Sequence, residues 1–187
     1  MKLFFNQAVN SFKTIGSIKP SSKHLINNCL KDLNFDKEQI IIEFGAGDGC
    51  ITEEILKRIP ANSQLISFET NSTFYKYCKA KFKSYPNFTI LNKSALDFDV
   101  ILKDKSIDKI DFIISSLPLS LIDKKDVGNL IGKVNSTISK NGLFIQYQYS
   151  LGSYRFLKNQ FNDINLGFTF RNLPPTFIYR CSNKNKN

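Results

Sequence analysis

The stretch that decides the fold is Ile40-Ile41-Ile42-Glu43-Phe44-Gly45-Ala46-Gly47-Asp48-Gly49. Its first half is a short β-branched run, which is typical of a central strand in a parallel sheet. Its second half is a glycine-rich turn, where the backbone can approach a ligand closely and adopt unusual dihedral angles. A helix is predicted next, over residues 50–59, and Pro60 ends it. The stretch therefore predicts a strand, a ligand-binding turn and a helix that presents free N–H groups at its start.

Outward from this stretch, strand and helix patterns alternate. Further strands are predicted over residues 65–69, 88–91, 110–115 and 143–149, with a closing pair at 168–171 and 176–180. Helices are predicted from Ser21 or Ser22 to Phe35 and over residues 72–83, 123–140 and 153–161, with a short one capped by Ser94. This order predicts an α/β, Rossmann-like fold: a seven-stranded, mostly parallel sheet with an antiparallel edge strand, and a ligand at the carboxyl ends of the strands.

The acids around the turn indicate a cationic ligand. A dinucleotide fingerprint reads G-x-G-x-x-G and holds a pyrophosphate at the helix start. Here the third glycine comes one residue early, and Asp48 would repel a pyrophosphate. Glu43 precedes the glycines, and Glu69 ends the second predicted strand, where its carboxylate can accept both ribose hydroxyls. An ammonium and a sulfonium suit such a site, so S-adenosylmethionine is the expected cofactor.

Residues 40–115 resemble the core of the class I, S-adenosylmethionine-dependent methyltransferases. The resemblance implies that the glycine turn binds the methionine part, that the acid after the second strand binds the ribose, and that the turn after the third strand flanks the adenine. Many members of that family have Asp where this chain has Ser94, so capping of the next helix is an equal alternative for Ser94. The expected cofactor-binding residues are Glu43, Gly45, Ala46, Gly47, Gly49, Glu69, Thr70, Ser94, Ala95 and Ser115.

The methyl acceptor is expected at Ser115-Ser116-Leu117-Pro118-Leu119-Ser120, after the fourth strand. The adenine N6 methyltransferases, including the rRNA dimethylating family, have Asn or Asp, one residue, Pro and an aromatic residue here, and the aromatic stacks on the flipped base. Leu119 cannot stack in that way, and Ser116 offers fewer hydrogen-bonding groups than Asn. The turn therefore disfavours an adenine substrate.

Four further segments resemble the small bacterial phospholipid N-methyltransferases. These are residues 14–22, the Ser115-Ser116-Leu117-Pro118-Leu119 turn, Phe144-Ile145-Gln146-Tyr147-Gln148-Tyr149, and Asn172-Leu173-Pro174-Pro175. Together they span nearly the whole chain. The resemblance implies methylation of phosphatidylethanolamine toward phosphatidylcholine by a cytoplasmic enzyme, docked peripherally on the anionic inner membrane surface.

The acceptor site needs a group for the amine and a group for the phosphodiester. Aromatic faces can hold a methylated cation, and Tyr147 and Tyr149 alternate onto one face of the fifth strand; simple strand packing is an equal alternative. The expected catalytic residues are Ser116, Tyr147 and Tyr149, with a tyrosine as a proton relay. The expected substrate-binding residues are Leu117, Pro118, Tyr154, Arg155 and Arg180.

Composition supports a polyanionic partner. The 187 residues carry a formal net charge of +10, concentrated in residues 1–40 and 151–187. The single histidine, His24, argues against a zinc site or a Ser-His-Asp triad, and no metal is expected. The four cysteines form no metal-binding pattern and are expected to be reduced, mostly buried thiols.

The whole chain, residues 1–187, is expected to form one domain and to be monomeric. Residues 1–20 are expected to be an amphipathic segment, with Phe5, Val9 and Phe12 on one stripe, that binds a membrane or closes over the cofactor. Residues 182–187 are expected to be a flexible tail. No apolar run is long enough to span a bilayer.

Two alternatives stay open. The first is an rRNA adenine N6-methyltransferase, favoured by the basic charge and the Leu-Pro turn; such enzymes usually add a C-terminal helical domain, whereas this chain is expected to stop after its last strand. The second is a cofactor-binding protein without catalysis that attaches to membranes or RNA through its basic ends.

Overall fold

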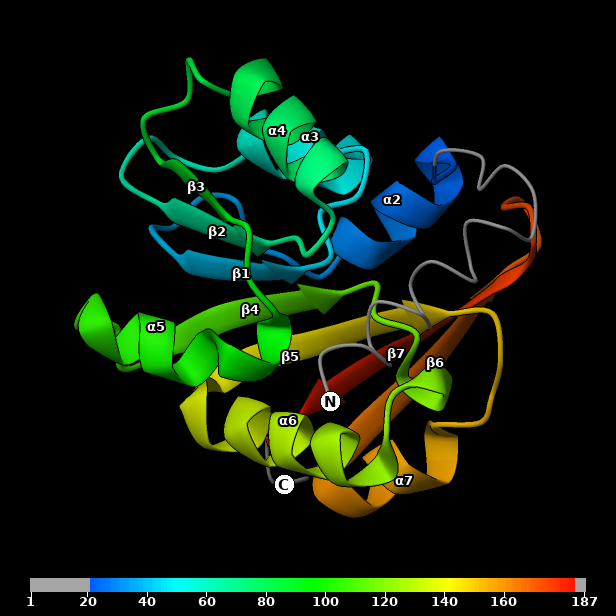
Figure 1. Ribbon diagram of the computed structural model, residues 1–187. Coiled ribbons are helices and arrows are strands. Elements are labelled where there is room, and N and C mark those ends of the chain that lie inside the picture. Colours follow the sequence, from blue (N-terminus) through cyan, green and yellow to red (C-terminus); the bar gives the residue numbers. More distant parts are fainter. Residues whose placement is uncertain (1–20, 184–187) are drawn as a thin grey trace.

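A seven-stranded sheet forms the centre of the molecule in the computed structural model, which describes residues 21–183 (Figure 1). The strand order is β3-β2-β1-β4-β5-β7-β6. Strands β1 to β5 are parallel to their neighbours, whereas β7 is antiparallel to both β5 and β6. The strands are β1 Ile40–Phe44, β2 Gln64–Phe68, β3 Phe88–Leu91, β4 Ile110–Ser115, β5 Ile138–Gln148, β6 Asp163–Thr169 and β7 Thr176–Ser182. The predicted fold class is confirmed: the sheet is mostly parallel, and an antiparallel pair closes one edge.

Helices cover both faces of the sheet (Figure 1). On one face lie α2 (Lys23–Leu30), α3 (Cys50–Leu56) and α4 (Ser72–Lys81), and on the other lie α5 (Phe98–Asp104), α6 (Lys124–Thr137) and α7 (Tyr154–Gln160). Two short 3₁₀ helices, η1 (Ala95–Asp97) and η2 (Leu119–Leu121), follow β3 and β4.

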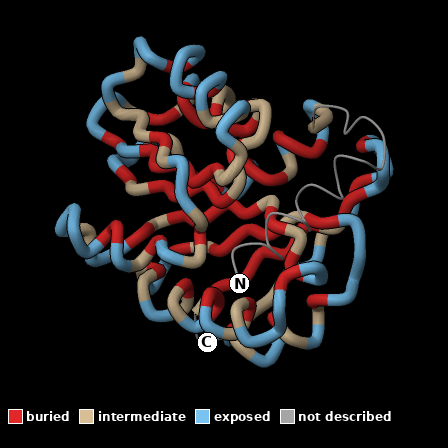
Figure 2. The backbone as a smooth tube through the Cα atoms, in the orientation of Figure 1, coloured by how far each residue is buried: buried red, intermediate tan, exposed pale blue. Residues whose placement is uncertain are grey.

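The sheet separates two hydrophobic cores. Side chains alternate along each strand, so Ile41 packs under α2, α3 and α4, whereas Ile42 and Phe44 pack against the helices of the opposite face. Both faces of the central strands are therefore apolar, as the β-branched run predicted, and the buried backbone in Figure 2 follows these strands.

Polar side chains start the helices where the sequence predicts. Ser22 Oγ accepts a hydrogen bond from Leu25 N at 3.2 Å, and Asn71 caps α4 through the N–H groups of Thr73 and Phe74. These caps satisfy N–H groups that have no partner within the helix.

Several predicted boundaries were wrong. The helix that starts after Ser22 ends at Leu30 instead of Phe35, because the chain turns there and Asp32 forms an ion pair with Arg180 of β7. Strand β5 starts at Ile138, directly after α6, rather than at residue 143. Gly142 permits this, since a Cβ there would lie 2.6 Å from the Asp111 carbonyl oxygen of β4.

The C-terminal hairpin also differs from its prediction. Strand β6 spans Asp163–Thr169 rather than residues 168–171. The alternation of Ile164, Leu166 and Phe168 was the available signal and was missed, and backbone pairing with β7 runs along the whole strand. Ser182 pairs with Asp163 and is buried, so it belongs to β7 and not to a tail. The predicted N-terminal helix and residues 184–187 lie outside the described residues.

The parallel strands end together at one edge of the sheet, which we call the carboxyl edge. Ligands of open α/β sheets bind in the crevice beyond this edge. The turn after β1, Glu69 after β2 and Ser116 after β4 all lie there, because β1 pairs in register with both β2 and β4.

Candidate active site

The turn after β1 is packed by protein at two glycines and open at the third. Gly45, Gly47 and Gly49 have φ angles of +83°, +55° and +77°, in the left-handed region that glycine adopts readily. A Cβ on Gly45 would lie 2.4 Å from Ser116 Oγ, and one on Gly49 would lie 2.7 Å from the Phe82 ring. A Cβ on Gly47 would meet no described atom within 4 Å. Gly47 is therefore where a ligand can approach the backbone.

Glu69 ties the turn to the end of β2. Its Oε2 accepts a hydrogen bond from Gly47 N at 2.9 Å, and its Oε1 accepts one from Asn71 N at 2.7 Å. The Asn92 side chain, beyond β3, donates to the Glu69 carbonyl oxygen at 2.8 Å. A carboxylate oxygen has two acceptor positions, so each oxygen of Glu69 can still accept a hydroxyl group. The roles of Asn71 and Asn92 were missed from sequence, although both follow strand ends.

Glu43 is buried beneath the turn. Its Oε2 accepts hydrogen bonds from Thr52 Oγ1 of α3 at 2.7 Å and from Ser67 Oγ of β2 at 2.6 Å. Among the described residues no hydrogen bond reaches Oε1. Burial raises the pKa of Glu43 to about 7, against the lowering effect of the two hydrogen bonds, and the nearby charges of Glu69 and Asp48 raise it further.

These residues fit S-adenosylmethionine. Glu43 lies beneath the turn, Asp48 lies within it, and Glu69 is bonded to Gly47, which opens on free space. The site therefore suits a ligand with an ammonium and a sulfonium and would repel a pyrophosphate. Ala46 is buried within the turn, and Thr70 follows Glu69 at the same edge. Glu43 and Glu69 would hold the two ends of the cofactor. No group of His, Cys, Asp and Glu in residues 21–183 is arranged to hold a metal ion.

Ser94 caps the helix that follows β3. Its Oγ accepts a hydrogen bond from Leu96 N at 3.2 Å, and Ala95 beside it is buried. The capping alternative is thus confirmed, while contact with an adenine ring stays a prediction.

The turn after β4 is fastened to the glycine turn. Ser116 Oγ lies 3.0 Å from the Gly45 carbonyl oxygen and 3.2 Å from that of Phe44, and donates to this pair. Ser115 Oγ accepts a hydrogen bond from Leu117 N. Leu117 and Leu119 are buried in the core on the α6 side, whereas Pro118 is half-buried. The expected acceptor turn therefore directly adjoins the cofactor turn.

Gln146 holds this turn against β5 and was not predicted as a site residue. Its Nε2 donates to the carbonyl oxygens of Leu117 at 2.9 Å and Tyr147 at 3.0 Å. Its Oε1 is buried with no partner among residues 21–183. The alternation of polar residues in β5 was the available signal.

Tyr147 and Tyr149 lie on one side of the sheet, near Cys50 at the start of α3. Burial raises the pKa of Tyr147 well above 10, helped by the nearby thiols of Cys50 and Cys29, against the lowering effect of a hydrogen bond with Ser116. Burial also raises the pKa of the half-exposed Tyr149, and Cys50 adds to this effect. Both phenols therefore stay neutral. Burial likewise raises the pKa of Cys50 to about 12, so its thiol is not reactive.

Tyr154 and Arg180 have surroundings other than those expected. Tyr154 packs on the opposite side of the sheet, with its ring 6.5 Å from that of Tyr179, so the sheet separates it from Tyr147. Arg180 is buried and engaged by the Asp32 carboxylate and by Asn28, which joins β7 to α2 and leaves it unavailable to a head group. Arg155 is exposed in the first turn of α7.

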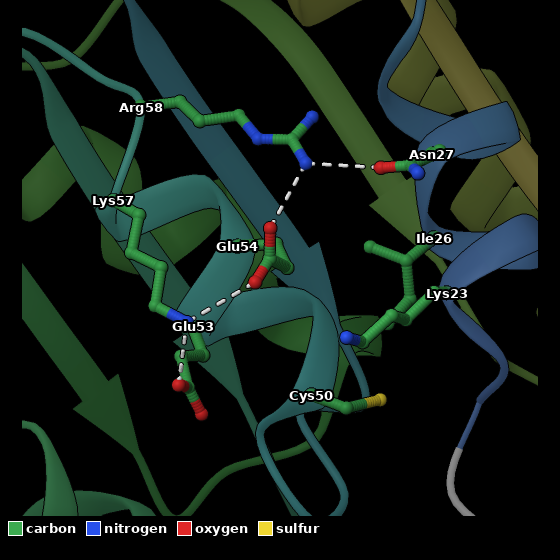
Figure 3. Close-up of a pocket in the computed structure, with 8 residues that line it drawn as sticks. All are labelled: Lys23, Ile26, Asn27, Cys50, Glu53, Glu54, Lys57 and Arg58. Atoms are coloured by element: carbon green, nitrogen blue, oxygen red, sulfur yellow. Dashed lines mark hydrogen bonds and ion pairs between the residues drawn. The ribbon is translucent and has the colours of Figure 1, made fainter.

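A separate groove of about 420 Å³ lies between α2 and α3 (Figure 3). Glu54 bridges Lys57 and Arg58, and Arg58 also donates to Asn27 at 3.0 Å. Glu43 and Glu69 do not line it. Because its charged side chains pair with one another, we assign this groove a structural role. Its lining residues are Lys23, Ile26, Asn27, Cys50, Glu53, Glu54, Lys57 and Arg58.

The amino-acid sequence matches a known protein family over the part of the chain that forms the glycine turn and the turn after β4. The family described as ribosomal RNA adenine dimethylase matches residues 20–131. The chain belongs to this family. It is an S-adenosylmethionine-dependent methyltransferase, and S-adenosylmethionine is its methyl donor.

Relatives of this dimethylase family member differ in how much of their length they share with it. An ornithine lipid N-methyltransferase of Singulisphaera acidiphila is 29% identical over 97% of this chain and 96% of its own length. A ribosomal RNA small subunit methyltransferase A of Sulfurihydrogenibium sp. is 30% identical over 58% of this chain and 41% of its own length. The chain therefore spans less than half of that rRNA methyltransferase.

Solved structures confirm the class I methyltransferase fold of this family member. The precorrin-6y C5,15-methyltransferase of Geobacter metallireducens has a TM-score of 0.69 at 12% identity, over 89% of this chain and 91% of that one. A methyltransferase of Geobacter sulfurreducens has a TM-score of 0.66 at 12% identity, over 94% and 88% of the two chains. At such identities the likeness concerns the fold alone.

Proposed function

We propose that this protein transfers methyl groups to the amine of a lipid head group at a membrane surface, with phosphatidylethanolamine as the leading candidate. The observation that carries the proposal is the match, over nearly the full length of both chains, to a lipid N-methyltransferase. That match includes β5, β6 and β7, which lie beyond residues 20–131. The strands expected to form the acceptor site are thus similar in sequence to a lipid N-methyltransferase.

The turn after β4 supports an amine over a flat base. A base-flipping enzyme holds its target between aromatic or apolar faces. Leu119, at the position where the aromatic residue is expected, is only 3% exposed and packs into the core. A base would therefore find no stacking partner at this position, whereas a small amine needs none.

The reaction requires a neutral amine with its lone pair in line with the methyl group. S-adenosylmethionine supplies a methyl group activated by its sulfonium. An alkylammonium with a pKa near that of Lys, about 10, is mostly protonated at neutral pH. A site beside buried Glu43 and half-buried Tyr147 stabilises an ammonium better than apolar surroundings would, but less well than water does. Transfer into the site therefore favours the neutral amine relative to water. Positioning and partial desolvation are the contributions we assign to the protein.

Tyr147 and Tyr149 are the proposed amine-binding pair. Since both phenols stay neutral, neither is the base that removes the amine proton. Their rings offer negative faces to a methylated ammonium. The hydroxyl of Tyr147, near Ser116, is the proposed relay that passes the amine proton to solvent water, so that the neutral amine attacks the methyl group. Arg155 is the remaining proposed contact for the phosphodiester.

We also propose that the enzyme works as a peripheral protein of the cytoplasmic membrane surface. Among residues 21–183, no helix is long and apolar enough to cross a bilayer. Support for surface binding comes from the formal charge of +10, which favours anionic lipid.

Methylation of rRNA adenine is the second candidate, because the matching family and several partial relatives carry that name. Labelled S-adenosylmethionine should be supplied together with phosphatidylethanolamine vesicles, ornithine-lipid vesicles or small-subunit rRNA. We expect label in the phosphatidylethanolamine fraction. Label in rRNA alone would establish the second candidate. Label in ornithine lipid alone would keep the lipid methyltransferase proposal but replace phosphatidylethanolamine by ornithine lipid as the acceptor.

Two variants make this assay specific. Glu69→Gln removes the carboxylate that holds the glycine turn and should abolish transfer to every acceptor. Glu54→Gln, in the separate groove between α2 and α3, should leave transfer unchanged. No transfer to any acceptor by protein that binds S-adenosylmethionine tightly would contradict catalysis and favour a cofactor-binding protein.

A further inference from the structure

The hairpin of β6 and β7 carries an apolar ridge that grows more exposed toward its tip. Leu166 and Phe168 of β6 are 41% and 52% exposed, and Phe170 beyond the strand is 74% exposed. The three share one face because side chains alternate along the strand. Leu173, in the connecting turn, is 67% exposed. We call these four residues the hairpin ridge; Phe170 and Leu173 are the most exposed large apolar side chains of residues 21–183.

The tip of the hairpin ridge lies at the carboxyl edge, beside the active site. Phe177, at the start of β7, pairs with both Phe168 and Gln148, the last residue of β5. The turn over residues 170–175 therefore extends past the end of β5. In Figure 1 this turn projects beyond α2, and in Figure 2 most of it is exposed.

The tip is held in place by buried hydrogen bonds. Asn172 is only 6% exposed; its Oδ1 accepts from Ser22 N at 2.9 Å, and its Nδ2 donates to Thr176 Oγ1 and to the Pro174 carbonyl oxygen, each at 3.0 Å. Asn172 points inward while its neighbours Arg171 and Leu173 point outward. These hydrogen bonds thus hold the turn in a conformation that leaves its apolar side chains exposed.

The surroundings of the tip are basic. Arg171 is exposed within the turn, and exposed Lys23 follows Ser22, to which Asn172 is bonded. Arg155 is exposed in α7, which packs beside β6. The sequence has no Asp or Glu from residue 164 to the end, nor from residue 1 to 31. An anionic surface would meet cations and apolar side chains at this turn, whereas the Glu43 and Glu69 carboxylates of the carboxyl edge are buried.

We propose that the hairpin ridge inserts into the interface of an anionic bilayer and sets the carboxyl edge against the lipid. Leucine and phenylalanine next to cations are the composition that enters the boundary between head groups and acyl chains. RNA would instead need stacking faces and many phosphate contacts. Here Phe170 is the only aromatic at the very tip, and its neighbours are Leu173 and two prolines. The inference rests on the proposed function for the choice of bilayer over RNA.

The chain contains no Trp, so a single Trp can report on the tip. The test uses the full chain carrying Leu173→Trp, mixed with vesicles of phosphatidylethanolamine and phosphatidylglycerol. We expect its emission to shift to shorter wavelength on vesicle binding and to be quenched by lipids brominated in the acyl chain. The matched control is Val100→Trp, on α5, where Val100 is 57% exposed. Its emission should not change.

A second measurement gives the strength of the contact. Phe170→Ser combined with Leu173→Ser should weaken vesicle binding, measured by sedimentation, by about tenfold or more, since each exposed side chain contributes about a three- to tenfold factor when about half of it leaves water. Val100→Ser should have no effect. Both variants should bind S-adenosylmethionine as the parent chain does.

Three results would overturn the inference: no vesicle binding by the full chain, no change of Leu173→Trp emission on bound vesicles, or blue-shifted emission already without vesicles, which would mean that protein covers the tip. Loss of rRNA binding instead of vesicle binding in the double Ser variant would assign the ridge to RNA. The proposed function is tested separately by lipid labelling. Insertion without methylated lipid would refute that function alone, and methylated lipid without insertion would refute the ridge alone.

Discussion

Glu43 has a pKa near neutrality, so its charge depends on pH in the range where the enzyme is assayed. Below about pH 6 the buried carboxyl is mostly protonated, and above about pH 8 it is mostly ionised. If the cationic cofactor requires the ionised form, its affinity should rise about tenfold from pH 6 to pH 8. Calorimetric titration with S-adenosylmethionine measures this. Glu43→Gln should bind weakly with no such slope, and an equal slope in that variant would assign the pH effect elsewhere.

The same pKa shift affects stability. The folded-state pKa of about 7 lies above the ordinary value of 4.5, so the folded state holds its proton more tightly than the unfolded state between these values. The stabilisation is complete below pH 4.5 and is lost as pH rises through 7, a fall of about 3 kcal/mol in the free energy of unfolding. Denaturant unfolding at several pH values should show this fall in the parent chain and a smaller one in Glu43→Gln.

Gly47 and Gly49 separate cofactor binding from folding. Gly47→Ala places a methyl group in open space, so its cost to stability should be only the left-handed backbone, about 1 kcal/mol. Its affinity for S-adenosylmethionine should nevertheless fall at least tenfold. Gly49→Ala meets the Phe82 ring and should lower stability by a further 1–3 kcal/mol or so. Thermal unfolding and calorimetry distinguish the two; equal losses of stability would contradict the proposed opening at Gly47.

For single residues, the sequence predicted which side chains surround the glycine turn after β1 but not which hydrogen bonds they form. The spacing of Glu43 and Glu69 from the glycines indicated an acidic site, since register alone brings strand ends together. That Glu43 bonds to Thr52 and Ser67 depends on side-chain directions across α3 and β2, which no local pattern contains. Arg180 looked like a free cation in sequence because its partner Asp32 is 148 residues away.

Among the elements, η1 offers a test of the two roles weighed for Ser94. Asp caps a helix as well as Ser does, so Ser94→Asp should leave stability unchanged, whereas Ser94→Ala should cost about 1 kcal/mol. If the turn after β3 also flanks the adenine, Ser94→Asp should bind S-adenosylmethionine more tightly, because it adds an acceptor for the adenine amine. Unchanged affinity in both variants would leave capping as the only role.

The contact between α2 and β7 makes a prediction about Arg180. Asp32→Asn leaves the buried guanidinium without its carboxylate and should lower the free energy of unfolding by about 2 kcal/mol, less than for a fully buried pair because Asp32 is partly exposed. Denaturant titration measures this loss. Asp36→Asn, in the loop that follows, is the control and should be neutral. A raised KM for lipid in Asp32→Asn at full stability would restore Arg180 to the substrate site.

Element order and type followed from the sequence, because every helix with a strong cap and every β-branched strand was found within a few residues. The two misplaced strand starts have different causes. The first part of β5 is stabilised by backbone pairing with β4 and has mostly polar residues, so its side chains do not reveal it, whereas the alternation of Ile164, Leu166 and Phe168 in β6 was present in the sequence and was missed. Tertiary pairing decided the start of β5, and local propensity did not.

For the whole molecule, the decisive feature is where the positive charge lies relative to the carboxyl edge. Lys23, Arg155 and Arg171 are exposed near this edge, at the starts of α2 and α7 and in the hairpin turn. Lys103, Lys105 and Lys109 are exposed around the end of α5 and the start of β4, which is the opposite edge of the sheet. Both sets contribute equally to the net charge, but only the first can touch a membrane that the active site faces.

Replacing either set by Gln removes three positive charges and lowers the formal net charge from +10 to +7. Each cation close to an anionic bilayer contributes about 1 kcal/mol to binding, so loss of the first set should weaken binding to phosphatidylglycerol-containing vesicles on the order of 100-fold. Loss of the second set should change it little, since those side chains lie farther from the lipid than the Debye length of about 8 Å at physiological salt. Sedimentation over a salt series measures both. Equal weakening in the two variants would mean that total charge attracts the protein and that no particular edge faces the membrane.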